Sequence, residues 1–235
     1  MPLPNEGKRP LLAHLEELRW RFLRCFLWVG VGTAVGFYFA KDLLAWFIQP
    51  VGSVVFLSPI EPFLAYLKVA LIAGTALASP FLSAEAWGFL QPALFPHERR
   101  GFVFLIPASV GLFFLGGWFC WRFLLPVGLK FLLGFSSENM VPMITIGSYL
   151  GFAGWLLVGC GLFFQMPVAI LVLARAGIVR PATLLKQWRF AVLGIFVLAA
   201  VLTPTPDVAT QMLLALPMGF LYLVSVGLAF LVVKK

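Results

Sequence analysis

The stretch HLEELRWRFLRCFLWVGVGTAVGFYFA, residues 14 to 40, begins with a cluster of charged side chains and continues as an apolar run. Between Phe22 and Ala40 only Arg24 carries a charge. A helix needs about 20 predominantly apolar residues to cross a bilayer. The stretch therefore predicts a membrane-spanning helix at about 22–40, preceded by a short charged helical face.

The composition of the whole chain agrees with a membrane protein. Of 235 residues, 62% are hydrophobic and 11% are charged, and the mean hydropathy is +1.01. Soluble domains carry about 25% charged residues. Spanning segments are either helices or the strands of a closed barrel, and barrel strands alternate polar and apolar residues. The apolar runs here are continuous, so we expect an all-α integral membrane protein.

The apolar runs predict six transmembrane helices in one membrane domain that covers residues 1–235. No internal repeat is evident, and the first run lacks the features of a cleaved secretory signal. The fifth run is short, because Phe190 to Leu202 supplies only 13 residues. The predicted spans are 22–40, 63–83, 102–125, 149–174, 189–203 and 208–230.

The basic residues predict the orientation of these helices. Cytoplasmic loops of membrane proteins carry an excess of Lys and Arg. Thirteen of the 17 basic residues lie at one set of helix boundaries, so both termini are expected to face the cytoplasm. The net charge of +8 mostly reflects this asymmetry and requires no nucleic-acid partner. The thirteen are Lys8, Arg9, Arg19, Arg21, Arg24, Arg99, Arg100, Arg175, Arg180, Lys186, Arg189, Lys234 and Lys235.

Enzymatic chemistry finds little support in the sequence. The only histidines, His14 and His97, lie at helix boundaries, whereas an intramembrane protease needs a base or metal ligand inside the bundle. The three cysteines are scattered through apolar runs, and no phosphate-binding loop is present. We therefore expect no catalytic residue, no metal and no cofactor.

Two carboxylates on the cytoplasmic side are candidates for binding a ligand. Glu17 precedes Arg21 by four residues, which suits a solvated helix surface as well as a binding site. Glu98 lies in the loop EAWGFLQPALFPHERR, residues 85–100, near the aromatic Phe89. Carboxylates pair with arginine through two directed hydrogen bonds. Glu17 and Glu98 together would suit a ligand with two adjacent arginines.

Other polar residues lie deeper in the membrane or at its outer side. Gln165 is expected about 15 Å from the cytoplasmic end of its helix, where it serves either interhelical packing or a polar patch facing a partner or lipid. Glu61 and Lys68 lie on one helix face, where a structural role is favoured. Asp207 follows two prolines and is expected to cap the sixth helix.

Five segments in order resemble the TatC family, the polytopic core of the twin-arginine protein translocase. The resemblance extends from about residue 11 to 230. The segments are HLEELR (14–19), LSPIEPF (57–63), WGFLQPALFPHERR (87–100), GLFFQMPV (161–168) and LTPTPDVATQ (202–211).

The resemblance implies six helices in a cupped, concave bundle within the bacterial cytoplasmic membrane. It also implies binding of twin-arginine signal peptides, recruitment of the single-span partners TatA and TatB, possible self-association, and export of folded proteins driven by the proton-motive force. The family's signal-binding glutamates fall on Glu17 and Glu98, and its loop aromatic falls on Phe89. Arg19 matches a further position of the first segment, in either a structural or a functional role.

One position departs from the family pattern. The fourth span of the family commonly carries a glutamate where this chain has Gln165, and an amide cannot carry charge. A six-span transporter or channel for small solutes is the alternative function. Such proteins more often have polar groups at the midplane and internal repeats, whereas the polar residues here gather at the cytoplasmic rim.

Overall fold

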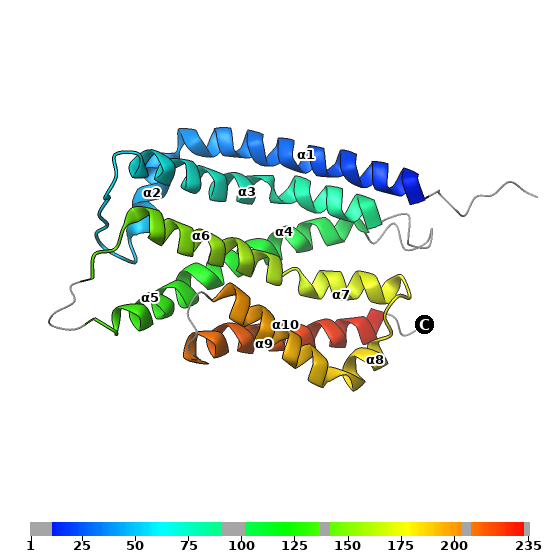
Figure 1. Cartoon of the computed structure of the whole chain (residues 1–235). Coiled ribbons are helices and arrows are strands. Elements are labelled where there is room, and N and C mark those ends of the chain that lie inside the picture. The colour runs from blue at the N-terminus through cyan, green and yellow to red at the C-terminus, as the bar shows by residue number, and fades with distance from the viewer. Residues whose placement is uncertain (1–10, 91–101, 137–141, 204–207, 233–235) are drawn as a thin grey trace, which may run out of the picture.

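The helices of the chain lie side by side in one bundle (Figure 1). The computed structural model describes residues 11–90, 102–136, 142–203 and 208–232. Within these ranges the regular secondary structure is helical, apart from one isolated parallel bridge between Val55 and Thr145. The all-α prediction is therefore confirmed. The first helix begins and the last one ends at the same end of the bundle (Figure 1). This arrangement agrees with the prediction that both termini face the same side of the membrane.

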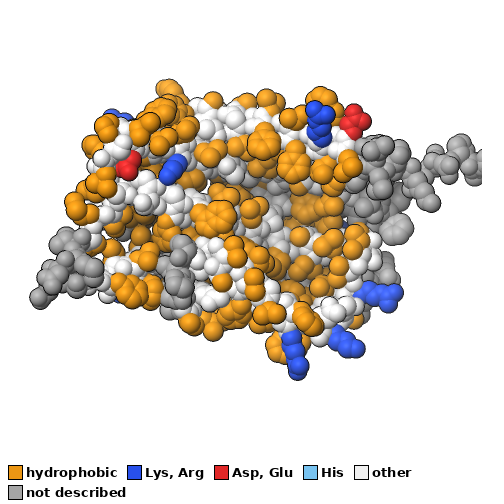
Figure 2. Space-filling view, in the orientation of Figure 1, with side chains coloured by type: hydrophobic (Ala, Val, Ile, Leu, Met, Phe, Trp, Pro, Cys, Tyr) orange, Lys and Arg blue, Asp and Glu red, His pale blue; other side chains and the backbone are white. Residues whose placement is uncertain are grey.

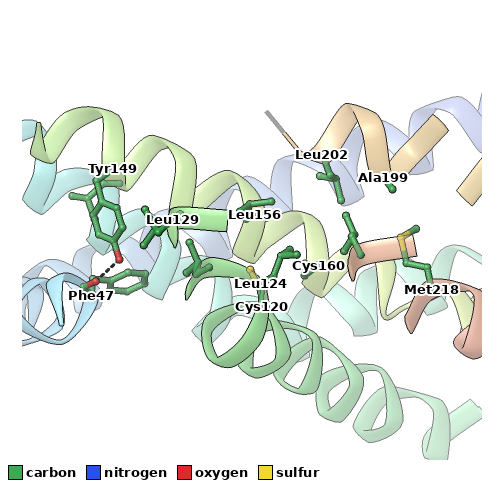
Figure 3. Close-up of a cluster of buried hydrophobic side chains, with 14 of the residues drawn as sticks. Phe47, Cys120, Leu124, Leu129, Tyr149, Leu156, Cys160, Ala199, Leu202 and Met218 are labelled. Carbon is green, nitrogen blue, oxygen red and sulfur yellow. Dashed lines mark hydrogen bonds between the residues drawn. The ribbon is translucent and has the colours of Figure 1, made fainter. Parts of the chain in front are cut away.

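The opening stretch forms one continuous helix, α1 (Leu11–Tyr38), which includes the charged residues that precede the predicted span. The chain then turns by 81° into α2 (Ala40–Ile48). Leu44 and Phe47 of α2 are buried in the core. The Tyr149 hydroxyl donates to the main-chain oxygen of Phe47 at 2.6 Å and so fixes the end of α2 (Figure 3).

Four long apolar units of the described chain satisfy the length and composition of a membrane span, and the bent α1–α2 pair makes a fifth. Of the four unbent units, two are interrupted and two are single helices. The shorter α9 has 15 residues, in agreement with the short fifth run of the sequence. The bounds are α3 (Glu61–Leu90), α4 (Phe102–Phe119) with the π-helical turn η3 (Cys120–Leu124) and α5 (Leu125–Leu133), α6 (Ile146–Phe163) with α7 (Met166–Arg175), α8 (Pro181–Lys186), α9 (Trp188–Leu202) and α10 (Val208–Val232).

Prolines account for the interruptions. The third helix was predicted to end at residue 125, but it continues to Leu133 as α5. Pro126 has no amide hydrogen, and the wider turn η3 precedes it, so the chain continues without that hydrogen bond. Pro167 likewise is the second residue of α7, which follows a turn at Phe164 and Gln165. Gln165 therefore lies at a break between two helices and not within a regular one.

The core lies where α6 crosses η3, α9 and α10. Its buried side chains include Leu124, Leu156, Leu202 and Met218, which converge in Figure 3. A second, smaller cluster joins α3, α4 and α7 near the end at which α1 begins. The outer surface is also apolar (Figure 2), and Phe26 is 71% exposed. Such a surface requires hydrocarbon around it.

Close contact between α1 and α3 fixes how these antiparallel helices align. A β-carbon placed on Gly74 would lie 2.4 Å from the Thr33 amide nitrogen, and one on Gly32 would lie 2.5 Å from the Gly74 oxygen. Gly36 approaches the Ala70 oxygen in the same way. Only small residues allow helix backbones to approach so closely. This crossing sets the register of every residue pair along the two helices.

Candidate functional site

The register of α1 and α3 brings charged residues together at the end where α1 begins. Gly32 lies against Gly74, and eleven residues further along each helix Arg21 meets Glu85. A further four residues along each helix bring Glu17 and Phe89 to the same level. Two predicted site residues therefore lie at the same level on neighbouring helices.

Four side chains form an ion-pair network at this level. Arg21 donates to one oxygen of Glu17, from Nη2 at 2.8 Å and from Nε at 3.2 Å. Its Nη1 donates to Glu85, both to Oε2 at 3.0 Å and to the main-chain oxygen at 3.1 Å. Arg24 donates to the two carboxylate oxygens of Glu85 at 3.3 and 3.5 Å. A single guanidinium thus bridges the two carboxylates.

Burial makes these contacts stronger than ordinary surface pairs. The side chains of Arg21, Glu17 and Glu85 are 20%, 22% and 14% exposed, whereas Arg24 is 57% exposed. A β-carbon on Gly88 would lie 2.5 Å from Nη1 of Arg21, so the guanidinium packs directly on the α3 backbone. Water screens partly buried pairs less than exposed ones. The two carboxylates and two guanidiniums carry no net charge together.

Glu85 is the residue that sequence reasoning missed. In the sequence it is one acid near the end of an apolar helix, without a basic residue three or four positions away. Its partners come from α1, 61 and 64 residues earlier in the chain. The glycines at 32, 36 and 74 were the available signal, because they determine the crossing of α1 and α3.

The other predicted residues of this end have different surroundings. Arg19 is exposed and makes no ion pair with any described residue. Phe89 is half-buried. The neighbouring Trp87 is buried, and its Nε1 donates to the Ser109 hydroxyl at 2.9 Å, which fixes the end of α3 against α4. Glu98 lies outside the described residues.

Gln165 makes an internal contact. Its Nε2 donates to the main-chain oxygen of Ser109 at 2.9 Å and to that of Gly161 at 3.5 Å. Ser109 is buried in α4, where its hydroxyl accepts from Trp87 and its main-chain oxygen accepts from Gln165. These hydrogen bonds agree with the interpretation that Gln165 serves interhelical packing. The residue is half-buried.

The predicted outer residues lie at the opposite end of the bundle. Glu61 accepts from the Leu57 amide at 2.9 Å at the start of α3. Lys68 donates to the Gly147 oxygen at 2.9 Å at the start of α6. These contacts hold α3, α6 and the segment between α2 and α3 together. Asp207 lies outside the described residues. Among those residues no group of three or more His, Cys, Asp or Glu could hold a metal ion.

Comparisons with known proteins agree in sequence and in structure. Residues 13–217 match the family model described as Sec-independent protein translocase protein (TatC). The TatC protein of Aquifex aeolicus is 35% identical over 234 residues, which cover 96% of this chain and 97% of that protein. The TatC protein of Koribacter versatilis is 37% identical, covering 95% of this chain and 86% of the relative.

Two solved structures have the same fold. A crystal structure of a twin-arginine translocase receptor, TatC, superposes with a TM-score of 0.80 at 35% identity and covers 94% of this chain and 100% of its own. A second crystal structure of such a receptor, in DDM, gives a TM-score of 0.81 and covers 92% of this chain and 99% of its own.

Proposed function

Because the chain belongs to the TatC family of Sec-independent protein translocase proteins, we propose that its Glu17 end receives the paired arginines of a signal peptide. Family membership makes the chain a multi-pass membrane component of protein translocation, not an enzyme and not a small-solute transporter. We place it in the bacterial cytoplasmic membrane with this end facing the cytoplasm. The positive-inside distribution of basic residues supports this orientation.

The observation that carries the proposal is that Arg21 is shared between two carboxylates. Glu17 holds Arg21 through one oxygen, and Glu85 holds the same guanidinium from its other side. An incoming arginine can therefore take the place of Arg21 on Glu17 while Arg21 keeps its two bonds to Glu85. The exchange leaves no buried charge without a partner, which would otherwise be costly.

Glu98 and Phe89 complete the proposed site. A peptide with two adjacent arginines needs a second carboxylate, and Glu98 is the acid of the loop that follows α3. Phe89 lies at the level of Glu17 near the end of α3, where its ring would border the peptide. Arg19 is exposed in α1, two residues from Glu17, and is proposed as a further residue of the peptide site.

We propose single-span subunits of the TatA and TatB kind, and further copies of this chain, as partners. Their helices would lie in the bilayer against the apolar sides of the bundle. Gln165 is the proposed polar contact within the membrane, because it is half-buried and sits at a helix break. Glu61 and Asp207 are proposed to shape the outer turns, without a role in binding the peptide.

The proposal can be tested by measuring peptide affinity. The protein would be placed in nanodiscs and titrated with a labelled signal peptide containing Arg-Arg. Glu17→Gln should weaken binding about 5- to 150-fold, since a charge-assisted contact is worth roughly 1–3 kcal/mol. Glu98→Gln should act in the same direction. A peptide with Lys-Lys should bind less tightly, because lysine lacks the planar fork.

Glu16→Gln is the matched control. Glu16 is the neighbouring carboxylate of the same helix and is exposed, so its loss changes the net charge equally without touching the network. Equal weakening by Glu16→Gln and Glu17→Gln would reduce the effect to general electrostatic attraction. If both Glu17→Gln and Glu98→Gln bind the peptide with wild-type affinity, the assignment of the peptide site to these carboxylates is wrong.

A further inference from the structure

A groove follows the contact between α3 and α6 and has a volume of about 390 Å³. Lys68 lies at one end, Trp155 and Val158 lie further along, and the remaining lining is almost entirely apolar. Gly151 lines the groove without a side chain, and a β-carbon there would meet only the Lys68 nitrogen, at 3.8 Å. The groove therefore pairs one cation with a long apolar floor.

The ammonium group of Lys68 has an incomplete set of partners. Of its three hydrogens, one bonds to the Gly147 oxygen at 2.9 Å. No carboxylate of the described residues lies within ion-pairing distance of Nζ. Glu61 on the same helix face instead accepts from the Leu57 amide. A cation at the edge of the hydrocarbon without an anion is costly.

This nitrogen lies at the start of α6, at the end of a predicted membrane span. The α-carbon of Lys68 is seven residues inside α3, but the side chain reaches back to Gly147 in the first turn of α6. Long basic side chains extend in this way toward the membrane interface. Along α6 the lining of the groove extends from Leu150 to Val158, about 12 Å at 1.5 Å per residue. This length is less than half of the hydrocarbon thickness of about 30 Å.

The rim of the groove is made of exposed apolar side chains. Leu71 and Trp155 border it and are 49% and 56% exposed. The hydroxyl of Thr75 is already bonded to the Leu71 oxygen at 2.8 Å, so it offers its hydrogen to no ligand. Among the side chains that line the groove, Lys68 supplies the only charged donor. A fitting ligand has an anionic head and at least one apolar chain.

We propose that the α3–α6 groove binds one anionic phospholipid of the leaflet at the α6 N-terminal end. The lipid phosphate accepts hydrogen bonds from Lys68, and one acyl chain lies between Thr75 and Trp155. This site is separate from the ion-pair network of Glu17, and it does not depend on the proposed peptide receptor. It lies at the opposite end of the bundle.

The test is native mass spectrometry of the whole chain in detergent, titrated with short-chain phosphatidylglycerol or phosphatidylcholine. Wild type should bind phosphatidylglycerol about tenfold more tightly, a difference typical of one charge-assisted contact. Lys68→Met should remove this preference. Lys41→Met removes an exposed cation outside the groove and should retain it.

A second variant tests the apolar part. Gly151→Leu keeps Lys68 and fills the groove, so it should weaken the binding of both lipids, and it provides the decisive result if Lys68→Met fails to accumulate. Unchanged binding of phosphatidylglycerol by Gly151→Leu, or by a folded Lys68→Met, would overturn the proposal. Competition by inorganic phosphate at the same concentration as the lipid would identify a plain phosphate site and would also overturn it.

Discussion

Arg21 and Glu85 are 64 residues apart in the chain, yet one guanidinium nitrogen of Arg21 donates both to the carboxylate of Glu85 at 3.0 Å and to its main-chain oxygen at 3.1 Å. The same arginine holds Glu17 on its other side. Any change at Glu85 is therefore transmitted to the proposed peptide site through Arg21.

Glu85→Gln should weaken binding of a twin-arginine peptide about 5- to 30-fold. Without the second carboxylate, Arg21 pairs only with Glu17, and the network gains one positive charge that repels the peptide. Peptide titration at fixed ionic strength measures the effect. The double variant Glu85→Gln/Arg24→Gln restores charge balance and should recover part of the affinity. Wild-type affinity in the single variant would show that Glu85 serves only helix packing.

Gly74→Ala should destabilise the protein by about 1–3 kcal/mol, as overpacking does. The added β-carbon would lie 2.4 Å from the Thr33 nitrogen and would push α1 away from α3. Thermal unfolding in detergent measures the loss, and peptide affinity should fall with it because Arg21 and Glu85 move apart. Gly30→Ala is the control, since a β-carbon there meets nothing within 4 Å. Equal stability of the two variants would contradict the tight crossing.

Gln165→Leu should lower stability by about 1 kcal/mol, because the hydrogen bond to the Ser109 oxygen is lost. Gln165→Glu should cost more when ionised, since its carboxylate would face a carbonyl oxygen without a hydrogen to donate. Thermal unfolding of both variants distinguishes this donor role from simple packing. If Gln165→Glu unfolds like wild type, the amide hydrogen is not what this position requires.

Reporters inserted near Ile178 should be found in the cytoplasm, and reporters inserted near Ser136 should be found outside. Ile178 lies in the exposed turn after α7, and Ser136 follows α5 at the other end of the bundle. Protease or enzymatic reporters in intact cells measure the two locations. The same location for both insertions would contradict the alternating path of the helices.

The sequence predicted the helices better than their contacts. Long apolar runs indicate membrane spans because, within the bilayer, the backbone N–H and C=O groups of each run must be hydrogen-bonded inside one helix. The 81° turn after Tyr38 was not predicted, because α2 depends on burial of Leu44 and Phe47 by distant segments. Glu17 was assigned from the match of its segment to a family motif, because its local charge pattern suits a solvated helix surface as well as a binding site. Glu85 was missed because its role arises from the α1–α3 register, which involves residues that are far apart in the chain.

Helix α9, from Trp188 to Leu202, has consequences for the mechanics of the surrounding membrane. Its 15 residues span about 22 Å, whereas the hydrocarbon is about 30 Å thick. Lipids beside it must compress, and the elastic strain costs fractions of a kcal/mol for each ångström of mismatch. Two short helices that lie side by side share one thinned region of bilayer, and the boundary of that region is shorter than the boundaries of two separate regions together. The bilayer itself would then draw short-helix neighbours toward α9, before any side chain of either protein makes contact.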